Sequence, residues 1–240
     1  MEPPYKYYRH KRHGKSTLVV TFASSGSKKH PIPPFAMKGV LSDAPVDKLF
    51  VRDDRNWYVF GAGPHQSVPA LAEWLQEQTC GYEHVHFTGQ SMGGYGALLL
   101  SLLVPNCNSV VAYAPQTCME KTKLSSWSDT SRWTTLKHLQ TSPTPELLDL
   151  YNIAPSHDCN RMVVYPRACP ADKKHAYNLV DLPFYNIWSF PSAHHSSFGK
   201  KMRDVGVMSG VTKALVGKES GPIRRIVRFF YKHERMLREK

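Results

Sequence analysis

The 240-residue sequence predicts an α/β fold with a mostly parallel central sheet flanked by helices. Three observations indicate this fold. Short β-branched, apolar runs alternate along the chain with stretches of helical periodicity. Most of these runs are continuously apolar, which is typical of parallel strands buried on both faces. The length is usual for one α/β domain, and the sequence has no internal repeat.

The predicted elements follow one another in a regular order. The first strand spans residues 17–23 and ends in a loop rich in serine and glycine, and the second spans 48–53. Ser67 caps a helix that has Pro69 in its first turn and continues to residue 79. A third strand, 84–88, leads through a glycine-rich turn into an apolar helix at 95–103. Strands at 109–114, 161–165 and 184–190 complete the sheet, and residues 118–156 are expected to form helices over its upper edge.

The positive charge is concentrated at the two ends of the chain. The net charge is +12, of which residues 1–16 carry +4 and residues 218–240 carry +5. We therefore divide the chain into a basic N-terminal segment (1–16), an α/β domain (17–217) and a basic amphipathic C-terminal helix (218–240). A protein that reads DNA more often carries its charge on a folded face, so no specific nucleic-acid partner is expected.

The C-terminal segment has the pattern of an amphipathic helix. Ile223, Ile226, Val227 and Phe230 share one face, and arginine side chains occupy the others. Such a helix suits an anionic membrane surface or an acidic partner. The alternative is a terminal helix whose apolar stripe packs on the protein's own sheet.

The five cysteines are odd in number and have no CxxC spacing, which favours reduced thiols and a cytoplasmic location. The N-terminus lacks the apolar core of a secretory signal, and no apolar run is long enough to span a bilayer.

No metal site is expected. His84 and His86 share one face of a strand, but a third ligand is not apparent.

The most specific motif is Gly89-Gln90-Ser91-Met92-Gly93, which has the form G-x-S-x-G. Its glycines permit a strained turn from strand to helix that lifts the serine hydroxyl clear of the backbone. A β-branched strand precedes the motif and an apolar helix follows it, and this context is what the motif requires.

With its neighbours Gly94, Gly96 and Ala97, this motif resembles the α/β-hydrolase superfamily, and in particular its esterase and acyl-hydrolase members. The resemblance covers roughly residues 17–210, and the segments 49–53 and 112–117 are similar to those of bacterial hydrolases of this clan. It implies a compact hydrolase with little or no cap, in which the serine is followed along the chain by an acid and then by a histidine.

The base and the acid are assigned from this order. The histidine should follow the last strand, where His194 and His195 are adjacent; we favour His195, because His-Ser-x-x-Phe resembles the histidine loop of several esterases. The acid should follow the preceding strand, which favours Asp172 over Asp158 and Asp181. The simpler interpretation of Asp172 is a helix N-cap.

The oxyanion of an acyl-transfer intermediate requires two backbone amides. One is that of Met92, directly after the serine, and the other comes from the loop near Ala23 and Ser24. Candidates for substrate contact are Trp57, Tyr58 and Gln90. Large aromatic side chains at such positions more often pack in the core.

These residues predict hydrolysis of a carboxylic ester through an acyl-enzyme on Ser91, with His195 as general base and Asp172 orienting it. The chemistry needs no organic cofactor or metal. The substrate would be a small-molecule ester, and the resemblance to polysaccharide-associated members suggests an acylated carbohydrate. The alternative is a non-catalytic binding or scaffold protein of the same fold that docks through its basic ends.

Overall fold

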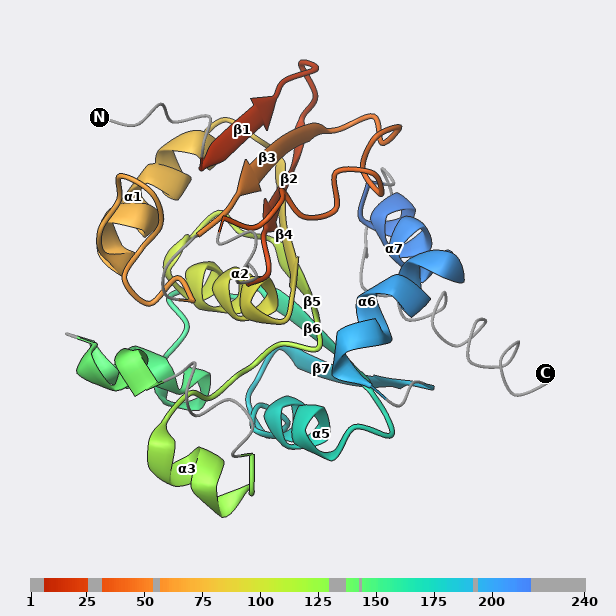
Figure 1. Cartoon of the computed structure of the whole chain (residues 1–240). Coiled ribbons are helices and arrows are strands. Elements are labelled where there is room, and N and C mark those ends of the chain that lie inside the picture. Colours follow the sequence, from red (N-terminus) through yellow and green to blue (C-terminus); the bar gives the residue numbers. More distant parts are fainter. Residues whose placement is uncertain are drawn as a thin grey trace.

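A seven-stranded sheet forms the centre of the molecule, with the strand order β1-β3-β2-β4-β5-β6-β7 (Figure 1). The computed structural model describes residues 7–25, 32–53, 57–129, 137–142, 144–191 and 194–216. The strands are β1 (Tyr8–Lys11), β2 (Thr17–Phe22), β3 (Asp47–Val51), β4 (His84–Gln90), β5 (Ser109–Tyr113), β6 (Asn160–Pro166) and β7 (Tyr185–Phe190). Strand β1 is antiparallel to β3, and the other neighbouring strands are parallel. The predicted α/β fold with a mostly parallel sheet is confirmed.

The helices include those predicted at residues 67–79 and 95–103, the second of which starts earlier than predicted. They are α1 (Val68–Thr79), α2 (Met92–Leu103), α3 (Lys121–Ser126), α5 (Pro170–Tyr177), α6 (His195–Asp204) and α7 (Val207–Val216), with 3-10 helices η2 (Lys137–Thr141), η3 (Pro145–Leu148) and η4 (Leu150–Asn152). The Ser67 side chain accepts a hydrogen bond from the Ala70 N–H, which confirms the predicted cap. Helix α2 begins at Met92, directly after the serine, rather than at residue 95.

Helices cover both faces of the sheet, and the strands alternate between two apolar layers. In β5, Val110 and Ala112 belong to the main core that includes α1 and α2, whereas Val111 and Tyr113 pack in a second cluster with Phe198 of α6. Figure 1 shows α1 and α2 on one side of the sheet and α6 and α7 on the other. Because both faces of the strand are buried, its sequence is apolar without alternation.

Residues 8–11 form the edge strand β1, which the sequence did not predict. Tyr8 is buried, and its hydroxyl donates to the Ala62 carbonyl, so the basic N-terminal segment contributes to the sheet.

The basic segment 218–240 lies outside the described residues. Among the residues that the structure describes, no helix is both long enough and apolar enough to cross a bilayer.

The order of the strands reverses beside β2. The chain passes from β2 to β3 on one side and then returns to β4 on the other, where Phe22 pairs with Gly89. In open parallel sheets, ligands bind outside the carboxyl ends of the strands at such a switch point. Ser24 follows β2 and Ser91 follows β4, so both lie at this edge.

Candidate active site

Ser91 lies on a sharp turn between β4 and α2. Its φ of 54° and ψ of −122° are in the left-handed half of the backbone map, where a residue with a Cβ is strained. Two backbone hydrogen bonds hold it there: the Ser91 N–H donates to the Tyr113 carbonyl (2.8 Å), and the Ser91 carbonyl accepts from the Tyr95 N–H (3.0 Å). The turn therefore depends on both β5 and the first turn of α2.

The two motif glycines are required by close approaches of the backbone. A Cβ on Gly89 would lie 2.2 Å from the Gly93 carbonyl oxygen, and a Cβ on Gly93 would lie 2.1 Å from the Phe22 carbonyl oxygen. Since no side chain fits at either position, the G-x-S-x-G pattern follows from packing of the turn. Gly93 also allows the start of α2 to lie close to the backbone of Phe22 and Ala23 at the end of β2.

The three side chains assigned from the sequence lie in one hydrogen-bonded chain. The Ser91 Oγ lies 2.9 Å from the His195 Nε2, and the His195 Nδ1 lies 2.8 Å and 3.0 Å from the two carboxylate oxygens of Asp172. Asp172 is buried, whereas the side chain of His195 is 25% exposed. A proton on Nδ1 is held by the carboxylate, which leaves Nε2 free to accept the serine proton.

The structure rejects two alternatives, His194 as the residue facing the serine and Asp172 as a helix N-cap. His194 precedes α6 at its N-cap position and is exposed, so the ring that meets the serine belongs to His195. Asp172 lies inside the first turn of α5, and the N-cap of that helix is Cys169. The interpretation of Asp172 as an N-cap is therefore wrong.

Of the two amides predicted near the end of β2, that of Ala23 is already engaged by the sheet. The Ala23 N–H donates to the Val51 carbonyl at 2.9 Å, so it is not available for an oxyanion. The Ala23 carbonyl accepts from the Tyr58 hydroxyl at 2.9 Å. Because a trans peptide is planar, this contact also fixes the direction of the Ser24 N–H. Ser24 remains the candidate donor from this loop, together with Met92 at the first position of α2, where helix amides lack intrahelical acceptors.

Gln116 is a polar residue at the site that the sequence did not single out. It is 1% exposed; its Oε1 accepts from the Ser91 hydroxyl at 3.1 Å, and its Nε2 lies 3.4 Å from the His195 Nε2. The residue follows β5, the neighbour of the serine-bearing strand. The sequence signal that could have identified Gln116 is a polar side chain just after the carboxyl end of β5.

No protein-family model matches the sequence, and no curated protein matches it. Among solved structures, the capsule O-acetyltransferase of Neisseria meningitidis serogroup A is similar, with a TM-score of 0.60 at 16% identity over 87% of this chain and 90% of that one. Acetyl xylan esterase 1 from Thermoanaerobacterium sp. JW/SL YS485 gives 0.52 at 14% identity, over 82% and 77%. Esterase B from Lactobacillus rhamnosis gives 0.54 at 12% identity, over 95% and 80%.

The structural neighbours are α/β hydrolases. At these identities, the likeness concerns the fold. In the α/β-hydrolase fold, the strand–serine–helix turn lies at the carboxyl edge of the sheet, as Ser91 does here.

Two of the three predicted substrate contacts are corrected by burial. Tyr58 is fully buried and packs against Phe22 and Gly96, so it cannot touch a substrate. Burial, followed by the nearby Asp53 carboxylate, raises the pKa of Tyr58 well above its usual value, so its hydroxyl stays a donor to the Ala23 loop. Trp57 is also buried in the main core.

The third predicted contact, Gln90, is only partly buried. Its side-chain amide lies against α6, where a Cβ on Gly199 would come within 1.9 Å of the Gln90 Oε1. The amide therefore packs between the serine turn and the helix that carries His195. Contact between Gln90 and a substrate stays a prediction.

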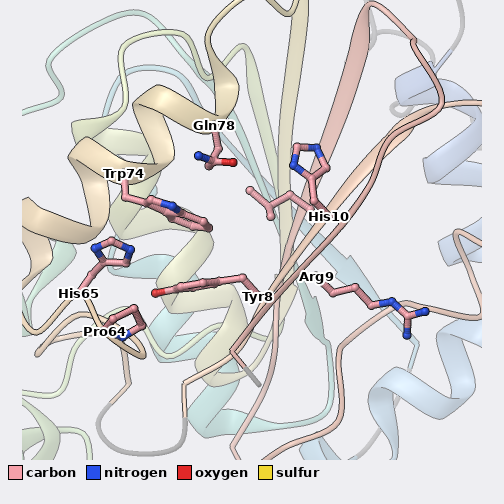
Figure 2. Close-up of a pocket in the computed structure, with 8 residues that line it drawn as sticks. Tyr8, Arg9, His10, Pro64, His65, Trp74 and Gln78 are labelled. Atoms are coloured by element: carbon pink, nitrogen blue, oxygen red, sulfur yellow. The ribbon is translucent and has the colours of Figure 1, made fainter. Parts of the chain in front are cut away.

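A cavity of about 420 Å³ lies apart from these residues, between the edge strand β1 and helix α1 (Figure 2). Its aromatic wall is Trp74, whose ring stacks on Tyr8 at 4.1 Å and on His65 at 5.2 Å between centroids. Arg9 directs its guanidinium away from these rings (Figure 2). Neither Ser91 nor His195 lines this cavity.

One group of side chains in the described part of the chain has metal-ligand atoms close together: Cys118, Glu120 and Asp149. The Lys123 ammonium lies 2.6 Å from the Asp149 carboxylate and already supplies a positive charge. Burial, followed by the charge of Asp149, raises the pKa of Cys118 to about 12, so its thiol stays protonated. We therefore interpret the group as the Lys123–Asp149 ion pair beside the buried Cys118 thiol, and not as a metal site.

Proposed function

We propose that this chain is a serine hydrolase that cleaves a carboxylic ester through an acyl-enzyme on Ser91. One observation carries the proposal: hydrogen bonds run from the buried Asp172 through both nitrogens of His195 to a hydroxyl on a strained turn. Residues that are 104 and 23 positions apart in the sequence meet in this arrangement. Packing alone does not require a strained serine that faces an oriented imidazole.

In the first half of the reaction, the His195 Nε2 takes the Ser91 proton as the Oγ attacks the ester carbonyl. Asp172 keeps the other nitrogen protonated and stabilises the imidazolium. The amides of Met92 and Ser24 stabilise the negative oxygen of the tetrahedral intermediate. The intermediate then collapses, the His195 proton goes to the departing alcohol, and Ser91 keeps the acyl group.

In the second half, His195 takes a proton from water while the water oxygen attacks the acyl carbon. Collapse of this second intermediate returns the proton to Ser91 and releases the carboxylic acid. The scheme uses only side chains and backbone amides of this chain.

We extend the proposal to an acetylated carbohydrate as the substrate class. Two structural neighbours are named as a capsule O-acetyltransferase and an acetyl xylan esterase. A cytoplasmic location belongs to the same proposal, since all five cysteines are free thiols.

The direct test is labelling with a fluorophosphonate, followed by mapping of the modified peptide. The label is expected on Ser91, because only an activated serine reacts readily. Ser91→Ala should lose labelling and lower kcat for a nitrophenyl ester by about 10⁴–10⁶-fold. Ser125→Ala, which changes an exposed serine on α3, is the matched control and should keep both.

Equal turnover by folded Ser91→Ala and wild-type protein would refute the proposal. A folded wild-type protein that takes no label on Ser91 would favour the alternative, a binding or scaffold protein of the same fold.

A further inference from the structure

Gln116 and His195 are alternative acceptors for the hydrogen bond that the Ser91 hydroxyl donates. The Ser91 hydroxyl can donate either to the His195 Nε2 at 2.9 Å or to the Gln116 Oε1 at 3.1 Å, but it has only one hydrogen. When the hydroxyl turns to Gln116, the amide nitrogen of Gln116 can donate to the His195 Nε2 at 3.4 Å. The three side chains therefore form a closed triangle.

The backbone that carries Gln116 is firmly held. The Thr117 N–H donates to the His175 Nδ1 at 3.2 Å, and the Thr117 hydroxyl donates to the His175 carbonyl at 2.6 Å. The Thr117 carbonyl accepts from the Leu150 N–H at 2.9 Å. His175 lies on α5, one turn after Asp172, so the same helix positions the amide and the acid. Gln116 has little freedom to withdraw from the site.

Acylation of Ser91 removes the hydrogen-bond donor of the Gln116 side-chain oxygen. Once Ser91 carries an acyl group, its Oγ has no proton to donate. Within the described part of the chain, the hydrogen bonds of the Gln116 side chain run to Ser91 and His195. The Gln116 Oε1 is then a buried acceptor beside the acyl group without its donor, which is unfavourable.

The attacking nucleophile decides whether that acceptor is satisfied. Water has two O–H groups: one donates to the His195 Nε2 and is transferred, and the other donates to the Gln116 Oε1. An alcohol has a single O–H, which His195 must take, so the Gln116 carbonyl stays unpaired. A site built to bind two donors rejects a molecule that has only one.

We infer that Gln116 selects water over alcohols in the second half of the reaction and so makes this chain a hydrolase rather than an acyltransferase. The inference rests on the proposed function. In the selected step, one water O–H bond breaks, the oxygen bonds to the acyl carbon, and the proton passes to the His195 Nε2. As the ester bond to Ser91 breaks, the same proton returns to the Oγ.

The test is a partition experiment with a nitrophenyl ester and a fixed concentration of methanol. Methyl ester and free acid are measured together, and their ratio depends only on the fate of the acyl-enzyme. Gln116→Met has a side chain of similar length without the acceptor and should raise the ratio about ten-fold, the effect of losing one hydrogen bond to the attacking water. Gln116→Glu retains an acceptor oxygen and should stay close to wild type. Gln76→Ala, an exposed glutamine on α1, is the control.

An unchanged or lower ratio in Gln116→Met would overturn the inference, as would an equal rise in Gln116→Glu. Partial misfolding does not affect the ratio, because only active molecules form product; if Gln116→Met is insoluble, Gln116→Ala replaces it with the same expectation. The release of nitrophenol is read separately. Without nitrophenol release in wild-type protein, the proposed function itself fails, whereas normal release with an unchanged ratio refutes only the role of Gln116.

Discussion

Two carboxylate–imidazole pairs lie along helix α5. In the first, Asp172 of α5 contacts His195 at 2.8 Å, and in the second, His175 of α5 contacts Asp129 at 3.3 Å. Both carboxylates are buried. The two imidazoles differ in access, since the His195 side chain is 25% exposed and that of His175 is 1% exposed.

In each imidazole, the nitrogen that does not face the carboxylate forms a hydrogen bond with a different kind of group. The His195 Nε2 faces the Ser91 hydroxyl, whose proton can be transferred, whereas the His175 Nδ1 accepts from the Thr117 backbone N–H, which keeps its proton. The first pair can serve as a base, and the second can only hold a loop. The third group, rather than the pair, decides whether an imidazole and a carboxylate support catalysis.

The largest expected effect is that of removing the base. His195→Ala should lower kcat by about 10⁴–10⁶-fold, the same loss as that expected for Ser91→Ala, because the serine and the histidine act as a unit. His194→Ala is the matched control and should change kcat little, since His194 is exposed. Steady-state turnover of a nitrophenyl ester measures both. The reverse order of effects would move the base to His194.

The two carboxylates provide the next contrast. Asp172→Asn should lower kcat by about 10²–10⁴-fold with the fold intact, because an amide favours the wrong tautomer of His195. Asp129→Asn makes the same chemical change in the second pair and should cost far less turnover. If both variants lose activity equally while circular dichroism stays native, the distinction between the pairs is wrong.

The second pair should instead affect stability. His175→Phe leaves the buried Thr117 N–H without its acceptor, which should lower the free energy of unfolding by about 1–3 kcal/mol. Urea denaturation followed by tryptophan fluorescence measures the change. A folded His175→Phe variant as inactive as His195→Ala would place both imidazoles in the reaction.

A third carboxylate, Asp47, should give the smallest effect. Burial raises its pKa, but hydrogen bonds from the His13 N–H, the Tyr82 hydroxyl and the Lys15 N–H outweigh burial, and its pKa lies below the usual value. A carboxyl whose pKa is lowered by folding adds stability above its unfolded pKa of ~3.9, and this is lost as the pH falls through the folded value. Asp47→Asn should therefore lower stability by on the order of 1 kcal/mol at neutral pH. Its melting temperature should also fall less steeply in acid than that of wild type, and parallel curves would contradict this.

The fold was predictable because the strands that form its centre are buried on both faces. Such strands have a sequence signal of their own, as β5 does. Ser91 could be predicted because the packing of the turn leaves room only for glycine on either side of it. The order of the chain then led to Asp172 and His195, which the structure brings to the serine.

The remaining features depend on contacts between residues far apart in the sequence. Strand β1 is polar at three of its four residues and exists because it pairs with β3. Tyr58 follows a loop like a surface aromatic, but its ring fills the space beside Gly96. Gln116 looks like an ordinary loop residue until Thr117 and His175 hold it against the serine.

The left-handed conformation of Ser91 also makes its reactivity a monitor of cooperativity. Its backbone bonds run to β5 and to the first turn of α2, a helix that is buried along nearly its whole length. Helices with few buried residues, such as α3, can open locally without disturbing these bonds. Loss of chemical modification at this one hydroxyl therefore reports unfolding of the central layer or of α5 and α6, which carry Asp172 and His195. Molecules that have opened only α3 remain reactive.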